Sequence, residues 1–308
     1  MSVNNDSDIL SDTSVFSSKN PLDKKCAPSK KYTLGSCIPL NSLIKMAEAY
    51  NIKYPDNSII LSNTLYTLNP TKYKKSLLKQ FHSRFKNICD DQKCWINQSY
   101  VNLIDKSIKY DLKKYTFRPD SPQGKYEWLN TLNINDVMYQ YEKKYPDFKF
   151  LGTVPADFQQ IPPLSFNLKF NFQNTDFLND LFDNGYRKFG MVFNLDEHNK
   201  SGSHWVALYS DFDKHAVYFS DSYGIEPEPR FRHFMRNLAR FIQLKYNIPQ
   251  HKLDVRHNTF RHQYGNSECG VYSLFFIINL LNGVSFDKLS SKRISDDFVN
   301  SCRDIYFF

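Results

Sequence analysis

The sequence feature that most constrains the fold is a long apolar segment near the end of the chain. Cys269–Asn282 reads CGVYSLFFIINLLN, and apolar residues fall on every face when it is drawn as a helix, which predicts a helix buried at the centre of a domain. The segment is shorter than the roughly 20 residues that cross a bilayer, and the first residues of the chain lack the pattern of a signal peptide. We therefore expect no membrane insertion and no secretion.

Segments rich in Val, Phe, Trp and Tyr precede this helix and predict strands. An amphipathic helix, Arg230–Tyr246, is expected after the third strand because apolar residues recur there at helical spacing. Strands followed by helices in this order indicate an α+β fold. The predicted strands are Arg187–Leu195, Ser203–Tyr209, Ala216–Phe219 and Leu253–His257.

The stretch RPDSPQGK marks a linker, so we place a domain boundary near residue 120. Residues 1–31 are rich in Ser, Asn, Asp and Lys and are expected to be flexible. Residues 32–120 contain short segments of helical spacing and are expected to form a basic, mostly helical arm. Residues 121–308 form the second predicted domain, which opens with a helix that Asn133 is expected to cap.

The positive charge of the chain is confined to its first part. Residues 1–125 carry 20 Lys and Arg against 11 Asp and Glu, whereas residues 126–308 carry 20 against 21. One interpretation is an arm that meets DNA or an acidic partner. The other is a solvated helical surface, because no nucleic-acid-binding signature accompanies the charge.

The cysteines are too sparse in a chain of 308 residues for a disulfide scaffold, so we expect reduced thiols and an intracellular location. His251, His257 and His262 lack cysteines or carboxylates at ligand spacing, which favours loop histidines over a metal site. Neither GxGxxG nor GxxxxGK occurs, and no cofactor is expected. The six cysteines are Cys26, Cys37, Cys89, Cys94, Cys269 and Cys302.

Five residues fit a nucleophilic site. Cys269 starts the buried helix, where unpaired backbone N–H groups favour a thiolate. His204 could be its base, and Asp221, at the end of the next predicted strand, could hold the Nδ1–H of that imidazole. Gln263, six residues before Cys269, could donate to an oxyanion, and Gly270 would let a substrate backbone approach the sulfur. Taken singly, each also has an ordinary structural interpretation, such as a core thiol or a turn-capping aspartate.

The stretches HWVALY, FSDS and QYGNSECG, in this order and followed by a helix, resemble the catalytic core of the adenain/Ulp1-type cysteine proteases. LNTLNINDVMYQYEKKY and LSSKRISDDFVNSCRDIYFF resemble most the SUMO-1-protease-like branch of asfarviruses and other nucleocytoplasmic large DNA viruses. The resemblance implies a papain-like core over residues 121–308, with a mixed central sheet flanked by helices and a buried helix that starts at the catalytic cysteine. The mostly helical arm would precede this core.

The resemblance also implies roles for single residues. Cys269 becomes the nucleophile, His204 the general base and acid, and Asp221 the residue that orients the imidazole. Gln263 would hold the oxyanion together with the backbone N–H of Cys269, and Trp205 would line a narrow substrate channel. Some viral relatives carry Asn where this chain has Asp221.

By the same resemblance, the expected function is an endopeptidase that processes viral structural precursor polyproteins after Gly-Gly-type sites, in the host cytoplasm and in the virion. Two alternatives stay open. One is an isopeptidase that removes ubiquitin-like modifiers with the same residues. The other is a non-catalytic virion or nucleic-acid-binding protein, favoured by the basic arm over residues 1–125.

Overall fold

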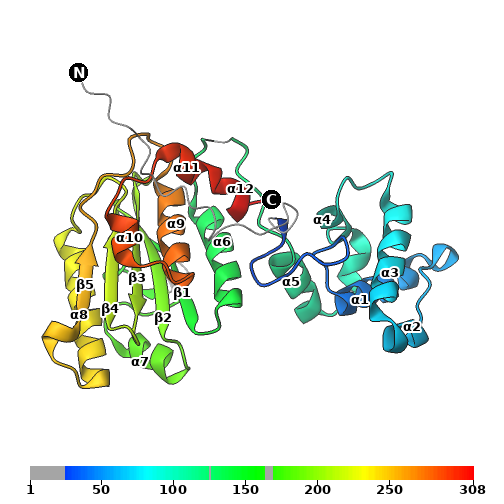
Figure 1. Ribbon diagram of the computed structural model, residues 1–308, viewed down its shortest axis with the longest axis horizontal. Coiled ribbons are helices and arrows are strands. Elements are labelled where there is room, and N and C mark those ends of the chain that lie inside the picture. Colours follow the sequence, from blue (N-terminus) through cyan, green and yellow to red (C-terminus); the bar gives the residue numbers. More distant parts are fainter. Residues whose placement is uncertain (1–24, 125, 164–168) are drawn as a thin grey trace. The chain divides into compact units, whose positions relative to one another are not determined.

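The chain folds into two compact units, which Figure 1 shows as ribbons. The C-terminal unit spans Ser121–Tyr306, and the N-terminal unit spans residues 25–120 together with Phe307–Phe308. Among the residues that the structure describes, no helix has the length and the apolar character that crossing a membrane requires. The computed structural model describes residues 25–124, 126–163 and 169–308.

The flexible segment expected over residues 1–31 falls largely on residues 1–24, which lie outside the described part of the chain. In its remainder, Cys26 is 1% and Ala27 is 0% exposed. The backbone N–H of Ala27 donates to the carbonyl oxygen of Thr116 at 3.0 Å. These residues are thus fixed to the N-terminal unit.

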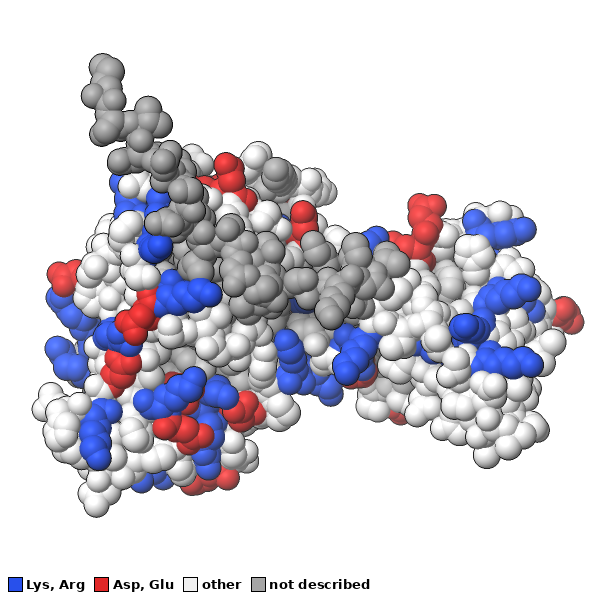
Figure 2. Space-filling view, in the orientation of Figure 1, with Lys and Arg blue, Asp and Glu red and all other residues white. Residues whose placement is uncertain are grey.

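Short helices around an aromatic core make up the N-terminal unit. The rings of Phe85 and Tyr100 stack at 5.7 Å and 18°, and Tyr50 meets Phe85 edge-on at 5.7 Å. Such ring pairs add to the free energy gained from burial. Lys and Arg side chains are spread over the face of this unit that Figure 2 shows. The helices are α1 (Leu40–Lys53), α2 (Asn63–Leu68), α3 (Pro70–Phe85), α4 (Gln92–Trp95) and α5 (Lys106–Tyr115).

Two disulfide bonds cross-link this unit. Cys26 bonds to Cys37, and Cys89 bonds to Cys94, with Cα–Cα distances of 5.3 and 5.5 Å. The expectation of six reduced thiols is therefore wrong for these four residues, whereas Cys269 and Cys302 form no disulfide bond. The two partners of each bond are close in sequence, and the local turns that bring them together carry no pattern that their spacing alone reveals.

The C-terminal unit is built on one mixed five-stranded sheet in the order β1-β2-β3-β4-β5. The strands β2, β3 and β4 are antiparallel neighbours, whereas β1 is parallel to β2 and β5 is parallel to β4. The sheet and its flanking helices confirm the predicted α+β class. The strands are β1 (Phe148–Val154), β2 (Lys188–Asn194), β3 (Trp205–Asp211), β4 (Ala216–Ser220) and β5 (Asp254–His257).

Helices cover both faces of this sheet. All four predicted strands are found, as is the predicted helix over Arg230–Tyr246, but β1 and α7 were not predicted. The helices of the unit are α6 (Thr131–Lys144), α7 (Asp176–Asp183), α8 (Pro229–Tyr246), α9 (Cys269–Leu281), α10 (Phe286–Ser290), α11 (Asp296–Ser301) and α12 (Arg303–Tyr306).

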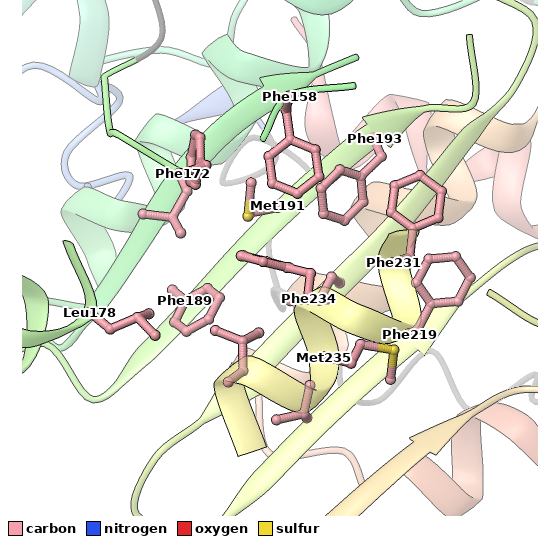
Figure 3. Packing of buried hydrophobic residues seen from close by; sticks show 14 of the residues in the cluster. Phe158, Phe172, Leu178, Phe189, Met191, Phe193, Phe219, Phe231, Phe234 and Met235 are labelled. Carbon is pink, nitrogen blue, oxygen red and sulfur yellow. The ribbon is translucent and has the colours of Figure 1, made fainter. Parts of the chain in front are cut away.

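One face of the sheet packs against α7 and α8. Alternate residues of β2, Phe189 and Phe193 among them, point to this face because strand side chains alternate. Phe193 lies 4.8 Å from the ring of Phe231 and 5.1 Å from that of Phe158. Figure 3 shows this dense aromatic layer between sheet and helix. The layer holds the strands in one register.

The opposite face packs against α9. Gly190 of β2 lies between Phe189 and Met191, whose side chains belong to the aromatic layer. A Cβ added to Gly190 would face α9 and lie 3.1 Å from Cγ2 of Ile277. All 13 residues of α9 are buried, which confirms the predicted central helix. The prediction that Asn133 caps α6 is wrong by three residues. Asn130 is the N-cap, and Asn133, at the third helical position, completes the capping box.

We expect the core of the C-terminal unit to respond strongly to truncation on α8. Leu238→Ala should lower the free energy of unfolding by about 2–5 kcal/mol, because Leu238 is 0% exposed and its removal leaves a cavity. The same substitution at Leu244, which is 71% exposed on the same helix, should change it by less than about 0.5 kcal/mol. Urea unfolding of the full chain measures both, and equal losses would contradict the packing described.

Candidate active site

Three of the predicted site residues lie at the ends of elements that converge. Cys269 is the first residue of α9, His204 immediately precedes β3, and Asp221 immediately follows β4. In the antiparallel pairing of these strands, Ala207 lies opposite Ser220. Continuing that register brings the residues before β3 next to the residues after β4, at one edge of the sheet.

The imidazole of His204 connects the other two side chains. Its Nε2 lies 2.8 Å from Oδ1 of Asp221, and a hydrogen bond also joins the ring to the thiol of Cys269. The expectation that Asp221 holds Nδ1 is wrong, since the carboxylate reaches the far nitrogen of the ring across the two strand ends. The structure therefore brings Cys269, His204 and Asp221 together, as predicted.

Neighbouring side chains fix this arrangement. The ring of Tyr223 stacks on that of His204 at a centroid distance of 4.5 Å. The backbone N–H of Tyr223 donates to Oδ1 of Asp221 at 2.8 Å. Asn258, which is 2% exposed, accepts from the backbone N–H of Asp221 and donates to its carbonyl oxygen. Tyr223 directly follows the FSDS stretch of the resemblance, whereas no local pattern marks Asn258.

Burial and hydrogen bonding act in opposite directions on His204. The exposed fractions of His204, Asp221 and Cys269 are 7%, 3% and 3%. Burial lowers the pKa of the His204 imidazole, but the hydrogen bonds to Asp221 and Cys269 outweigh it and raise the pKa from 6.5 to about 9. The imidazole is therefore positively charged at neutral pH.

Gln263 lies on the loop before α9 and is completely buried. Its Oε1 accepts from the hydroxyl of Ser222 at 2.6 Å, and its Nε2 donates to the carbonyl oxygen of Gly265 at 3.1 Å. The backbone N–H groups of His262 and Gln263 both donate to the carbonyl oxygen of Ser222. These bonds attach the loop to the segment after β4, and an amide nitrogen keeps a second hydrogen for a further acceptor.

Trp205 and Gly270 pack against each other beside the thiol. The indole N–H of Trp205 donates to the carbonyl oxygen of Leu129 at 2.8 Å. A Cβ on Gly270 would lie 2.9 Å from Cβ of Leu129 and 3.3 Å from Cδ1 of Trp205. The space next to Gly270 is therefore filled by these two side chains, which differs from the expected approach of a substrate backbone.

A groove of about 410 Å³ opens next to these residues. His204 and Trp205 line it together with Trp128, Leu129 and Gly202. A peptide that lies in this groove would pass the imidazole. In the part of the chain that the structure describes, no group of three or more His, Cys, Asp or Glu side chains could hold a metal ion.

A buried thiol at a helix start, hydrogen-bonded to an imidazole that a carboxylate holds, is the arrangement of a cysteine protease. Residues 191–307 match the Ulp1 protease family, C-terminal catalytic domain. A protein of Acanthamoeba polyphaga mimivirus that is named as a thiol protease is 35% identical over 280 residues, covering 88% of this chain and 89% of its own. The chain belongs to the Ulp1 protease family and is a thiol protease.

Two further comparisons concern African swine fever virus. Its SUMO-1 cysteine protease is 24% identical over 237 residues, which cover 71% of this chain and 83% of that protein. The crystal structure of the protease from this virus matches with a TM-score of 0.63 at 21% identity, over 92% of this chain and 95% of that one. The likeness in structure extends over both units, and it concerns the fold.

The charge of His204 gives a testable pH dependence. Its folded-state pKa of about 9 lies above the ordinary 6.5, so its stabilising contribution is fully present below pH 6.5 and is lost as the pH rises through about 9. The NMR signal of the His204 ring should titrate near pH 9, and Asp221→Asn should lower this midpoint because burial then dominates. The stability difference between the two proteins should shrink as the pH approaches 9.

His262 provides the internal control for this titration. Burial and the charge of Arg293 lower its pKa to about 4, and its Nδ1 accepts from the backbone N–H of Ile294 at 3.1 Å. His262 should therefore stay neutral at the pH values where His204 is charged. A His204 midpoint near that of an exposed histidine would refute the ion pair.

Proposed function

We propose that this protease matures viral precursor polyproteins by cutting after Gly-Gly-type sites, with Cys269 as its nucleophile. The observation that supports this most is the chain of hydrogen bonds from Asp221 through His204 to Cys269, at the side of the groove lined by Trp205. The host cytoplasm and the virion are the locations that fit such a substrate.

The reaction proceeds in two steps. The thiolate of Cys269 attacks the scissile carbonyl carbon and forms a C–S bond, while imidazolium His204 gives its proton to the leaving amine as the C–N bond breaks. Neutral His204 then takes a proton from water, whose oxygen attacks the thioester carbon; the C–S bond breaks and releases the carboxylic acid product and the Cys269 thiolate, which restores the thiolate–imidazolium pair. Asp221 stabilises the imidazolium in both steps and is not itself protonated.

Gln263 stabilises the negative charge that develops on the carbonyl oxygen. Its Oε1 is held by Ser222 and one hydrogen of Nε2 by Gly265, so the second hydrogen has a fixed direction. The backbone N–H of Cys269, at the first position of α9, is the second donor. Donors fixed before the reaction need no reorganisation when the oxyanion forms.

The groove favours a substrate segment without side chains next to the cut. Trp205 and Leu129 fill the space beside Gly270, and the indole of Trp205 is held by its bond to the backbone of Leu129. A rigid wall of this kind restricts the side chains that fit next to the cut by steric overlap, which supports glycines there. A separate prediction concerns the N-terminal part of the chain: its excess of Lys and Arg suits the binding of DNA or of an acidic partner.

A second candidate is an isopeptidase that removes a ubiquitin-like modifier. The relative from African swine fever virus is named a SUMO-1 cysteine protease, which supports a modifier as the substrate. The same four residues would carry out the reaction. The two candidates differ in the substrate that leads to turnover.

The two free cysteines allow a matched test of the nucleophile. Cys269→Ser should remove nearly all cleavage, whereas Cys302→Ser should leave it intact, because Cys302 is also buried but its thiol donates to the carbonyl oxygen of Phe298 within the C-terminal helical segment. Cleavage is measured on a panel of Gly-Gly-Xaa peptides, a precursor with Gly-Gly sites and modifier conjugates. Turnover by Cys269→Ser would refute the site, and turnover of modifier conjugates alone would establish the second candidate.

The role of Gln263 predicts a defect in the rate of the chemical step. Gln263→Ala should lower kcat by a factor on the order of 10²–10³, the usual effect of losing an oxyanion donor. Ser222→Ala, which removes only the bond that holds Oε1, should lower it less. Steady-state kinetics on a cleaved peptide measures both, and an unchanged kcat for Gln263→Ala would exclude the role.

A further inference from the structure

Two charged side chains are buried next to the nucleophile although the proposed mechanism does not use them. Glu268 immediately precedes α9 and is 4% exposed, and Arg303, the first residue of α12, is 5% exposed. Removing a charge from water costs several kcal/mol unless other groups compensate it. Their burial therefore requires compensating contacts, and it points to a role other than stability.

Asn300 connects the two charges. Its Nδ2 donates to Oε1 of Glu268 at 2.9 Å, and its Oδ1 accepts from Nε of Arg303 at 3.1 Å. Oε1 of Glu268 also accepts from the hydroxyl of Ser267 at 2.6 Å. Nη2 of Arg303 donates to the carbonyl oxygens of Glu127 at 2.8 Å and Ser267 at 3.4 Å. One guanidinium thus fastens the loop before Cys269 to α11 and to the segment before α6.

Both side chains are charged. Burial raises the pKa of the Glu268 carboxyl, but the hydrogen bonds from Ser267 and Asn300 outweigh it and hold the pKa below its ordinary value. Burial lowers the pKa of Arg303, but an arginine stays protonated in proteins. Nη1 of Arg303 is buried and has no hydrogen-bond partner among the described residues, so part of its charge is not neutralised by a direct contact.

The thiol of Cys269 lies in the field of this pair. Arg303 interacts electrostatically with Glu268, Cys269 and Glu127. The carboxylate of Asp296 on α11 is directed elsewhere, to the backbone of the loop and the hydroxyl of Tyr272. His204, Tyr223 and Arg303 interact electrostatically with Cys269, Glu268 is its neighbour in sequence, and Asp221 lies behind His204.

We propose that Arg303 is a positioning residue of the active site, which holds the loop before α9 through Asn300 and Ser267 and offsets the negative charge of Glu268 at the Cys269 thiol. The proposal rests on the proposed function in taking Cys269 as the nucleophile. The negative charge of Glu268 alone would disfavour ionisation of the Cys269 thiol, whereas the positive charge of Arg303 alone would favour ionisation. The two side chains therefore have opposite effects on the ionisation of the thiol.

The experiment follows the alkylation of Cys269 by iodoacetamide against pH in the full chain, with peptide mass spectrometry and Cys302 as internal reference. Arg303→Met should move the midpoint of the pH–rate profile up by about one pH unit, because the charge of Glu268 is then uncompensated. Glu268→Gln, which keeps the acceptor for Asn300, should move it down by a similar amount. The double variant should return close to the wild-type midpoint.

Two exposed residues serve as controls for a change of charge alone. Asp304→Asn, next to Arg303 on α12, and Arg236→Met, on α8, should leave the midpoint in place. Arg303→Lys should keep the midpoint but slow cleavage, because a lysine retains the charge without the fork of donors. Circular dichroism shows whether Arg303→Met folds. If it does not, the downward shift of the alkylation midpoint in Glu268→Gln tests the proposal.

If Arg303 and Glu268 had a purely structural role, the alkylation midpoints of the two single variants would move in the same direction or stay in place. Either result would overturn the proposal. Its failure is separable from that of the proposed function, since alkylation is read out on Cys269 without any substrate. Cleavage by Cys269→Ser would refute the function and leave the alkylation shifts to decide the role of Arg303.

Discussion

The site depends on a buried hydrogen bond between two residues that lie 17 positions apart, His204 and Asp221. This bond forms only while β3 and β4 keep their register, because a shift by one residue would turn each side chain to the other face of the sheet. The register is fixed by the aromatic layer on one face and by α9 on the other. The catalytic geometry is therefore a property of the whole core.

Low exposure gives this bond its strength. In a site where the reacting groups are 7% exposed or less, water does little to screen the attraction between the imidazolium of His204 and the carboxylate of Asp221. The same burial makes each unpaired group costly, which explains why Ser222, Asn258 and Asn300 surround the site with short hydrogen bonds. Rigidity and charge stabilisation thus have one origin.

The sequence reveals the features that local pattern determines. Alternation and apolar runs located four strands and the buried helix, and the order of His204, Asp221, Gln263 and Cys269 indicated the chemistry. Other features depend on contacts between distant segments. The edge strand β1, the ring nitrogen that Asp221 holds and the link from Glu268 to Arg303 are set by packing, and no spacing in the chain encodes them. The disulfide partners escaped prediction because the low cysteine content argued for thiols.

Both disulfide bonds lie in the N-terminal unit, so a reducing medium changes the covalent structure of that unit and not of the C-terminal one. Cys26 and Cys37 are buried, at 1% and 3% exposed, whereas Cys89 and Cys94 are partly accessible to solvent. A reductant added to protect the catalytic sulfur therefore reaches the Cys89–Cys94 bridge before the other one. Preparations made at different thiol concentrations are then chemically distinct proteins, with one, two or no covalent ties outside the catalytic half.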